Sequence, residues 1–176
     1  MKTSIALIGF MGTGKTAVGK ALAERLGKEF VELDALIERK VGRTIPEIFQ
    51  QAVEMGFREL EIEVTKEVSK GRNLVIACGG GLVLNKINID RLRQQSRMVY
   101  LTTSPEVILK RVSGKSGERP LLKIAGRELN IREVLAFRKP FYERAADIII
   151  DTAKLDIDAV SKQIISKLKD DESFDL

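Results

Sequence analysis

Five short apolar runs are spaced along the chain, and charged segments separate them. The runs are nearly continuous rather than alternating with polar residues, which is typical of parallel strands that are covered on both faces. This pattern predicts strands at Ser4–Ile8, Glu29–Leu33, Asn73–Cys78, Arg97–Leu101 and Asp147–Asp151.

The segments between these runs are of helical length and composition. Helices are expected at Ala17–Leu26, Ala35–Lys40, Ile45–Gln51, Met55–Lys70, Ile89–Gln95, Pro105–Val112, Ile131–Glu143 and Ile157–Lys169. Asp34, Ser104 and Asn130 are typical helix-start residues. Strands that alternate with helices imply right-handed crossovers, so we expect a three-layer α/β/α sandwich around a five-stranded parallel sheet.

The length of the chain fits one domain over residues 1–176. Two segments depart from the simple alternation. Residues 34–72 are long enough for a helical insertion, and residues 113–127 form a glycine-containing loop that we interpret as a lid. The acidic tail after Lys169 is expected to fray.

Composition narrows the classes of function. The net charge is +5, aromatic residues make up 5%, and histidine and tryptophan are absent. A basic chain without stacking platforms or basic runs is a poor nucleic-acid binder, so the charge favours small anionic ligands. No apolar run reaches the ~18 residues of a membrane span, and we expect no signal peptide before the first strand. We expect a cytoplasmic monomer, since no leftover apolar helix face is evident.

Residues 9–16, Gly-Phe-Met-Gly-Thr-Gly-Lys-Thr, match the phosphate-binding loop G-x-x-x-x-G-K-S/T. The loop lies between an expected strand and an expected helix, which is the required context. Backbone amides and the helix N-terminus would bind the phosphates of a nucleotide. Lys15 would reach the β- and γ-phosphates, and the Thr16 hydroxyl would bind Mg²⁺.

Further candidate residues follow the next two strands. Glu32 and Asp34 end the second strand, where they are either ligands for magnesium or a substrate hydroxyl, or simply a strand-end acid and a helix N-cap. Gly79-Gly80-Gly81 follows the third strand and exposes amides to a small polar ligand, unless it is only a flexible turn.

Arginine and cysteine residues supply the remaining candidates. Glu61 lies three residues after Arg58 and could orient its guanidinium, although most pairs at this spacing are solvated. Arg119 lies in the expected lid, and Arg138 precedes Pro140 and Tyr142. The single cysteine, Cys78, is expected to be a buried core thiol, with a reactive thiolate as the alternative.

Taken in order, these motifs resemble the shikimate kinase family over residues 3–152. The matching segments are the phosphate loop, Phe-Val-Glu-Leu-Asp at 30–34, Phe57-Arg58 with Glu61, the triple glycine, Glu-Arg-Pro-Leu-Leu at 118–122, and Arg138-x-Pro140-x-Tyr142. The resemblance implies an ATP-dependent enzyme of the nucleoside-monophosphate-kinase type that phosphorylates the 3-hydroxyl of shikimate.

The resemblance also implies roles for individual residues. On the nucleotide side, ATP would be bound by Gly12, Thr13, Gly14, Lys15, Thr16 and Ala17, with Arg111 near the adenine and Arg119 on the transferred phosphoryl group. On the acceptor side, shikimate would be bound by Asp34, Arg58, Gly79, Gly80, Gly81 and Arg138. Lys15, Asp34 and Arg119 would be catalytic, and Thr16 and Glu32 would hold Mg²⁺. The acceptor-binding segment would span about residues 34–61.

Three positions depart from the family pattern. Glu32 replaces an aspartate, Ala77 replaces a serine or threonine near the magnesium shell, and Val53 replaces a glycine. Two alternatives therefore stay open: a small kinase for another acceptor, such as gluconate or a nucleotide, and a degenerate homologue that regulates a partner. The intact Lys15 and Asp34 argue against the second alternative.

Overall fold

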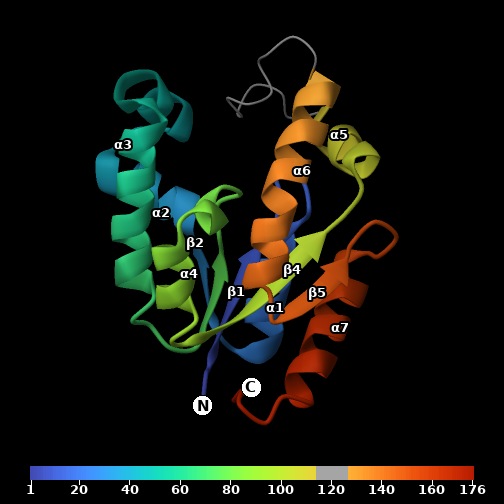
Figure 1. The fold of residues 1–176 in the computed structure, drawn as a ribbon. Coiled ribbons are helices and arrows are strands. Elements are labelled where there is room, and N and C mark those ends of the chain that lie inside the picture. The colour runs from blue at the N-terminus through green and yellow to red at the C-terminus, as the bar shows by residue number, and fades with distance from the viewer. Residues whose placement is uncertain (114–126) are drawn as a thin grey trace.

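A parallel β-sheet forms the centre of the molecule (Figure 1). The computed structural model describes residues 1–113 and 127–176, apart from the side chains of residues 52, 53, 113 and 127–129. The strands lie in the order β2-β3-β1-β4-β5, and all four neighbouring pairs are parallel. Their bounds are β1 Ser4–Ile8, β2 Glu29–Glu32, β3 Leu74–Ala77, β4 Ser96–Thr102 and β5 Ile148–Asp151. The predicted sandwich and its five strands are confirmed.

Helices cover both faces of the sheet. They are α1 Lys15–Leu26, α2 Leu33–Val41, α3 Ile45–Val68, the short 3₁₀ helix η1 Leu82–Leu84, α4 Lys86–Leu92, α5 Pro105–Ser113, α6 Arg127–Ala145 and α7 Ile157–Lys169. Alternate residues of β1 face opposite layers. Ile5 and Leu7 join the core under α1 and α7, whereas Ala6 and Ile8 join the core under α3, α4, α5 and α6.

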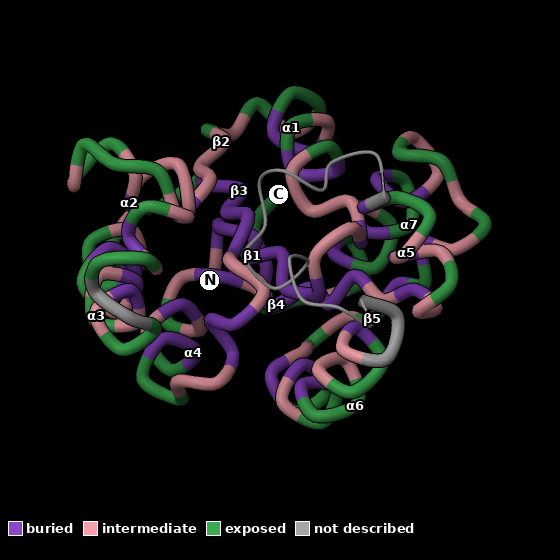
Figure 2. Tube along the Cα trace, turned by 90° about the horizontal axis from the view of Figure 1, so that it is seen from above, coloured by how far each residue is buried: buried purple, intermediate pink, exposed green. Residues whose placement is uncertain are grey.

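The strand order brings three loops to one edge of the sheet. The phosphate loop follows β1, and its neighbour β3 ends at the triple glycine, with β2 beside β3. Because all strands are parallel, their carboxyl ends share that edge. Seen from above, α2 and α3 lie on one side of the strand ends and α5 and α6 on the other (Figure 2). The arrangement leaves the site between two helical walls.

The helical insertion differs from the prediction. Ile45–Gln51 and Met55–Lys70 were expected as two helices, but α3 runs without interruption from Ile45 to Val68. No proline lies inside it after the first turn, and a single glycine, Gly56, is tolerated in a helix. The capping box of Thr44 and Glu47 fixes its start.

Other helix starts were also misplaced. Glu32, not Asp34, occupies the N-cap of α2, which puts Asp34 in the first turn. Asn130 lies inside α6, which begins at Arg127, and α4 covers Lys86–Leu92 rather than Ile89–Gln95. The start at Ser104 is confirmed, because its Oγ accepts a hydrogen bond of 3.4 Å from the amide of Val107.

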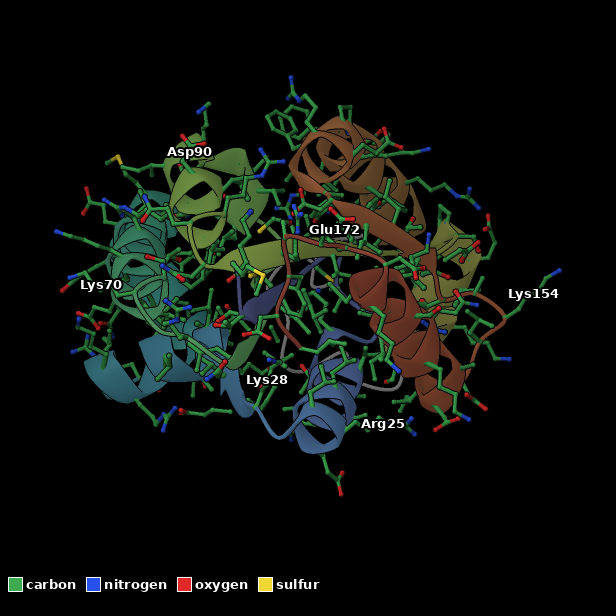
Figure 3. The ribbon with its side chains drawn as sticks, turned by 90° about the horizontal axis from the view of Figure 1, so that it is seen from below. Arg25, Lys28, Lys70, Asp90, Lys154 and Glu172 are labelled. Carbon is green, nitrogen blue, oxygen red and sulfur yellow. The ribbon has the colours of Figure 1, made fainter. Side chains whose placement is uncertain are left out.

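The C-terminal segment is ordered, contrary to the expected fraying. The amide of Lys2 donates to the carbonyl of Ser173, and the amide of Asp175 donates to the carbonyl of Lys2. Phe174 is buried in the core under α1 and α7. Arg97 fixes the preceding turn through a 2.7 Å hydrogen bond to Asp171. In Figure 3 the segment, marked by Glu172, crosses the end of the molecule away from the strand carboxyl ends.

None of the helices in the described part of the chain has both the length and the apolar character needed to cross a membrane. The longest helix, α3, carries charged residues throughout its length.

Asp171→Asn is expected to release the C-terminal segment. Hydrogen bonds from Arg97 and Ser173 lower the pKa of Asp171 to about 2, so its stabilising charge is present above the ordinary value of 3.8 and is lost as the pH falls through 2. At pH 7, amide exchange at Lys2 and Asp175 should accelerate by about tenfold. Asp170→Asn, at the exposed neighbouring residue, is the control; equal exchange in both variants would contradict the prediction.

Candidate active site

Two glycines shape the phosphate loop between β1 and α1. Gly12 and Gly14 have φ values of 75° and 97°, in the left-handed region that favours glycine. Gly14 is also the N-cap of α1, and it provides no side-chain cap. The first amides of α1 therefore lie at the positive end of the helix dipole, where an anion is favoured.

Two side chains brace the loop from inside. The Lys15 Nζ donates hydrogen bonds of 2.8 Å to the carbonyls of Gly9 and Phe10. The buried hydroxyl of Thr13 donates to the same Phe10 carbonyl, also at 2.8 Å. Lys15 is thus held over the concave side of the loop by carbonyl groups that phosphate oxygens can replace.

Thr16 and Glu32 lie close enough to share a metal ion. The Thr16 hydroxyl donates a 2.6 Å hydrogen bond to Glu32 Oε1. One hydroxyl and one carboxylate suit Mg²⁺, which keeps several waters and takes its other ligands from substrate phosphates. Among the described residues, no group of three or more His, Cys, Asp or Glu side chains is placed to hold a metal ion. The residues present therefore fit a magnesium–nucleotide complex.

Asp34 projects from the first turn of α2 toward the glycine turn. Its Oδ1 is buried and has no hydrogen-bond partner among the described residues. A Cβ added to Gly79 would lie 2.8 Å from that oxygen. Burial raises the pKa of Asp34, while the nearby charge of Lys15 acts in the opposite direction. An unsatisfied buried carboxylate oxygen is costly, and a ligand hydroxyl would satisfy it.

Each of the three glycines faces a charged side chain. A Cβ on Gly79 would also lie 3.1 Å from Glu61 Oε1, one on Gly80 would lie 3.6 Å from Arg138 Nη1, and one on Gly81 would overlap the guanidinium of Arg58. Within the described chain, none of the three backbone amides donates to another residue. Gly79 and Gly80 are half-buried and Gly81 is buried, so charged side chains from α2, α3 and α6 surround the turn closely.

Arg58 and Arg138 reach this turn from opposite walls. Arg58, on α3, forms an ion pair of 3.0 Å with Glu61, whose side chain is only 1% exposed. Arg138, on α6, is buried, and its guanidinium carbon lies 5.8 Å from the centre of the Phe10 ring. Burial raises the pKa of Glu61 to about 7, with Arg58 acting in the opposite direction. The expected role of Glu61 in orienting Arg58 agrees with this geometry.

Arg111 lies on the outer side of the phosphate loop. Its Nη1 donates to the carbonyl of Gly12 at 3.1 Å, and its Nη2 donates to the carbonyl of Thr152 at 3.0 Å. The buried Thr152 hydroxyl is 3.2 Å from the carbonyl of Thr13. Thr152 was not among the predicted site residues, although its place directly after β5 at the ligand-binding edge was a usable signal.

Tyr142 is a second supporting residue, and its role was not predicted. Its hydroxyl donates a 2.5 Å hydrogen bond to the carbonyl of Gly80, and its ring stacks on Tyr100 with centroids 5.0 Å apart. Cys78 is buried, and burial raises the pKa of its thiol, so the expected core thiol is confirmed and the reactive thiolate is not supported.

The described predicted residues thus gather at one edge of the sheet. Gly12–Ala17 form the loop and the start of α1; Glu32, Asp34 and Gly79–Gly81 lie at the ends of the two neighbouring strands, and Arg58 and Arg138 close the sides. Arg119 and residues 114–126 of the expected lid lie outside the described residues.

The strand order, the loop after the central strand and the acid at the end of the edge strand define a P-loop kinase of the nucleoside-monophosphate-kinase type. Comparison with known proteins is more specific. A family model described as shikimate kinase matches residues 11–169. The chain belongs to the shikimate kinase family.

Individual relatives agree with this assignment. The shikimate kinase of Caldanaerobacter subterraneus is 44% identical over 92% of this chain and 94% of its own. The shikimate kinase of Symbiobacterium thermophilum is 42% identical over 95% and 97%. The solved Acinetobacter baumannii shikimate kinase in complex with shikimate is 38% identical, covering 98% of this chain and 96% of that one, with a TM-score of 0.93. A gluconokinase from Sinorhizobium meliloti, at 18% identity over 96% and 92% of the two chains and a TM-score of 0.57, shares the fold alone.

Glu61→Gln should remove a pH dependence of stability. The folded protein holds the Glu61 proton up to a pKa of about 7, whereas the unfolded chain loses it near 4.5. The free energy of unfolding should therefore fall as the pH rises from 5 to 8, by about 1–3 kcal/mol from this residue. Urea unfolding at both pH values would measure the change. Glu59→Gln, on the exposed face of α3, is the control and should keep the slope; a slope that persists in Glu61→Gln would contradict the assignment.

Proposed function

We propose that this protein transfers the γ-phosphoryl group of ATP to the 3-hydroxyl of shikimate. The observation that carries the proposal is the glycine turn between the half-buried Arg58, the buried Arg138 and an unpaired carboxylate oxygen of Asp34, close to the phosphate loop. A small ligand with a carboxylate and several hydroxyls matches this set of groups. Membership of the shikimate kinase family supports the same reaction.

The acceptor would bind at the glycine turn. Arg58 and Arg138 would hold its carboxylate, because planar guanidinium groups form paired hydrogen bonds that lysine cannot form. The amides of Gly79, Gly80 and Gly81 would donate to it. Asp34 would accept a hydrogen bond from the reacting hydroxyl and either remove or orient its proton. Glu61 would keep Arg58 in place through the buried ion pair.

The nucleotide would bind at the loop, with phosphates on the amides from Gly12 to Ala17 and the adenine near Arg111. Mg²⁺ would be held by Thr16 and, directly or through water, by Glu32, and it would neutralise phosphate charge. Lys15 would stabilise charge that develops on the transferred group. From the sequence alone, we expect Arg119 to stabilise the same charge. Phosphoryl transfer needs chiefly positioning and charge stabilisation, which a site without histidine can supply.

The two alternatives receive less support. The gluconokinase likeness is at the level of the fold. A regulatory homologue would not need Lys15, Asp34, Arg58 and Arg138 to gather at the carboxyl ends of the strands. We further propose that the protein acts as a cytoplasmic monomer on small molecules, without nucleic-acid or membrane partners.

An assay of ADP release with ATP and Mg²⁺ tests the reaction directly. Shikimate should give kcat/KM values at least about 10³-fold above those for gluconate or nucleoside monophosphates, because its ring fixes the separation of carboxylate and reacting hydroxyl, whereas gluconate is an open chain and the nucleotides lack a carboxylate. Equal turnover with gluconate would favour the first alternative. ATP binding without any turnover would favour the regulatory homologue.

Asp34→Ala should lower kcat by at least about 10²-fold, as expected when a group that acts on the reacting hydroxyl is removed. The ATP dissociation constant should stay within about twofold, because the residue serves the acceptor. Asp170→Asn, an exposed aspartate at the end of α7, is the control and should leave both values unchanged. A parallel loss of ATP affinity in Asp34→Ala would show that the residue belongs to the nucleotide side.

A further inference from the structure

A cavity of about 310 Å³ lies where η1, α4 and α6 meet, away from the phosphate loop. It is a half-open hollow, and its apolar lining comes from Val83 and Leu84 of η1, Ile89 of α4, and Phe141 and Ala145 of α6. In Figure 3, α4, which carries the labelled Asp90, lies beside α6. The volume is at the lower end of the range for small-molecule sites.

The rim of this cavity is positively charged. Lys86, Arg93 and Arg144 line it against one acid, Asp90, which is paired with Lys86 at 2.5 Å. Arg93 and Arg144 form no ion pair with any carboxylate of the described residues. Two guanidinium groups beside an apolar hollow therefore lack an anionic partner.

The two arginines are held in different ways. Arg93 donates through Nη2 to the carbonyls of Arg144 and Ala145, each at 3.1 Å, and so caps the end of α6. The guanidinium carbon of Arg144 lies 4.9 Å from the centre of the Phe141 ring. A cation stacked on an aromatic ring keeps its edge free for hydrogen bonds in its plane.

We propose that this cavity binds a small aromatic carboxylate, at a site separate from the acceptor pocket. The carboxylate would pair with Arg144 and with the outward side of Arg93, because guanidinium groups match carboxylates in geometry and charge. The ring would pack on Phe141 and on the aliphatic side chains of η1 and α4. An inorganic anion would leave this apolar lining uncovered, and a polyol would be left without partners there.

The cavity shares structural elements with the acceptor pocket. η1 follows the glycine turn directly, since its N-cap is Gly81. Phe141 precedes Tyr142, whose hydroxyl holds the carbonyl of Gly80, and α6 also carries Arg138. A ligand in the cavity would thus contact both elements that shape the acceptor site.

Titration of the full chain with 3-phenylpropanoate tests this site. Calorimetry in the presence of saturating shikimate should give a dissociation constant of about 1 mM or tighter. Under the same conditions, amide chemical shifts should change at Val83, Leu84, Ile89 and Phe141. The uncharged 3-phenylpropanamide should bind about tenfold more weakly, because it lacks the charge that pairs with the guanidinium groups. Inorganic phosphate should not produce the same shifts.

Arg144→Gln is the variant of choice, because the Arg144 side chain supports no other described residue by a hydrogen bond. It should weaken binding of 3-phenylpropanoate by about tenfold, which corresponds to the loss of one charge-assisted pair. Lys139→Gln removes one positive charge from the same helix outside the cavity and should change binding by less than about twofold. Both variants should keep the unfolding midpoint of the parent protein.

Three results would overturn the proposal. The first is no binding of 3-phenylpropanoate at concentrations up to 10-fold above the expected dissociation constant of about 1 mM. The others are displacement of 3-phenylpropanoate by shikimate, and equal affinity for it in Arg144→Gln and the parent protein. Displacement would place the probe on Arg58 and Arg138 instead. Because these measurements follow binding and not turnover, their outcome is independent of the proposed reaction.

Discussion

The close approach of charged side chains to the main chain of Gly79–Gly81 is the constraint on which the site depends. The guanidinium of Arg58 occupies the space where a side chain of Gly81 would be, and Asp34 and Glu61 do the same at Gly79. Glycine at these positions lets a carboxylate from α2, an ion pair from α3 and an arginine from α6 meet around one turn. The turn follows strand β3 of the sheet, and α2, α3 and α6 provide the charged side chains around it.

This meeting of charges has an electrostatic consequence. Glu61 and Asp34 are both buried carboxyl groups with raised pKa values, and each is near a cation from another element. Burial favours their neutral forms, whereas Lys15, Arg58 and Arg138 favour the ionised ones. The two effects therefore oppose each other in setting the pKa values of Asp34 and Glu61. A polar ligand that binds at the turn would change this balance by adding hydrogen bonds to the same groups.

Features that depend on neighbouring residues could be predicted from the sequence, whereas contacts between residues far apart in the chain could not. The phosphate loop and the strands were predictable, since the first depends on eight consecutive residues and the second on continuous apolar runs. The continuity of α3 was missed because residues 52–54 were left outside both expected helices, whereas packing against α2 and α4 sustains one helix through them. Thr152 and Tyr142 were not assigned their supporting roles, because each bonds to a carbonyl that is far away in the sequence. The order of the C-terminal segment was missed for the same reason: Phe174 is held by residues near the start of the chain.

The pairing of Lys2 with Phe174 also bears on how the chain can be rearranged. It brings the first and last residues together at the end of the sheet opposite the phosphate loop (Figure 1). The two ends of the chain are therefore close to each other and far from the ligand-binding edge. A short linker across that junction would span little distance, so new chain ends could be opened in a surface loop while the strand order and the site remained as they are.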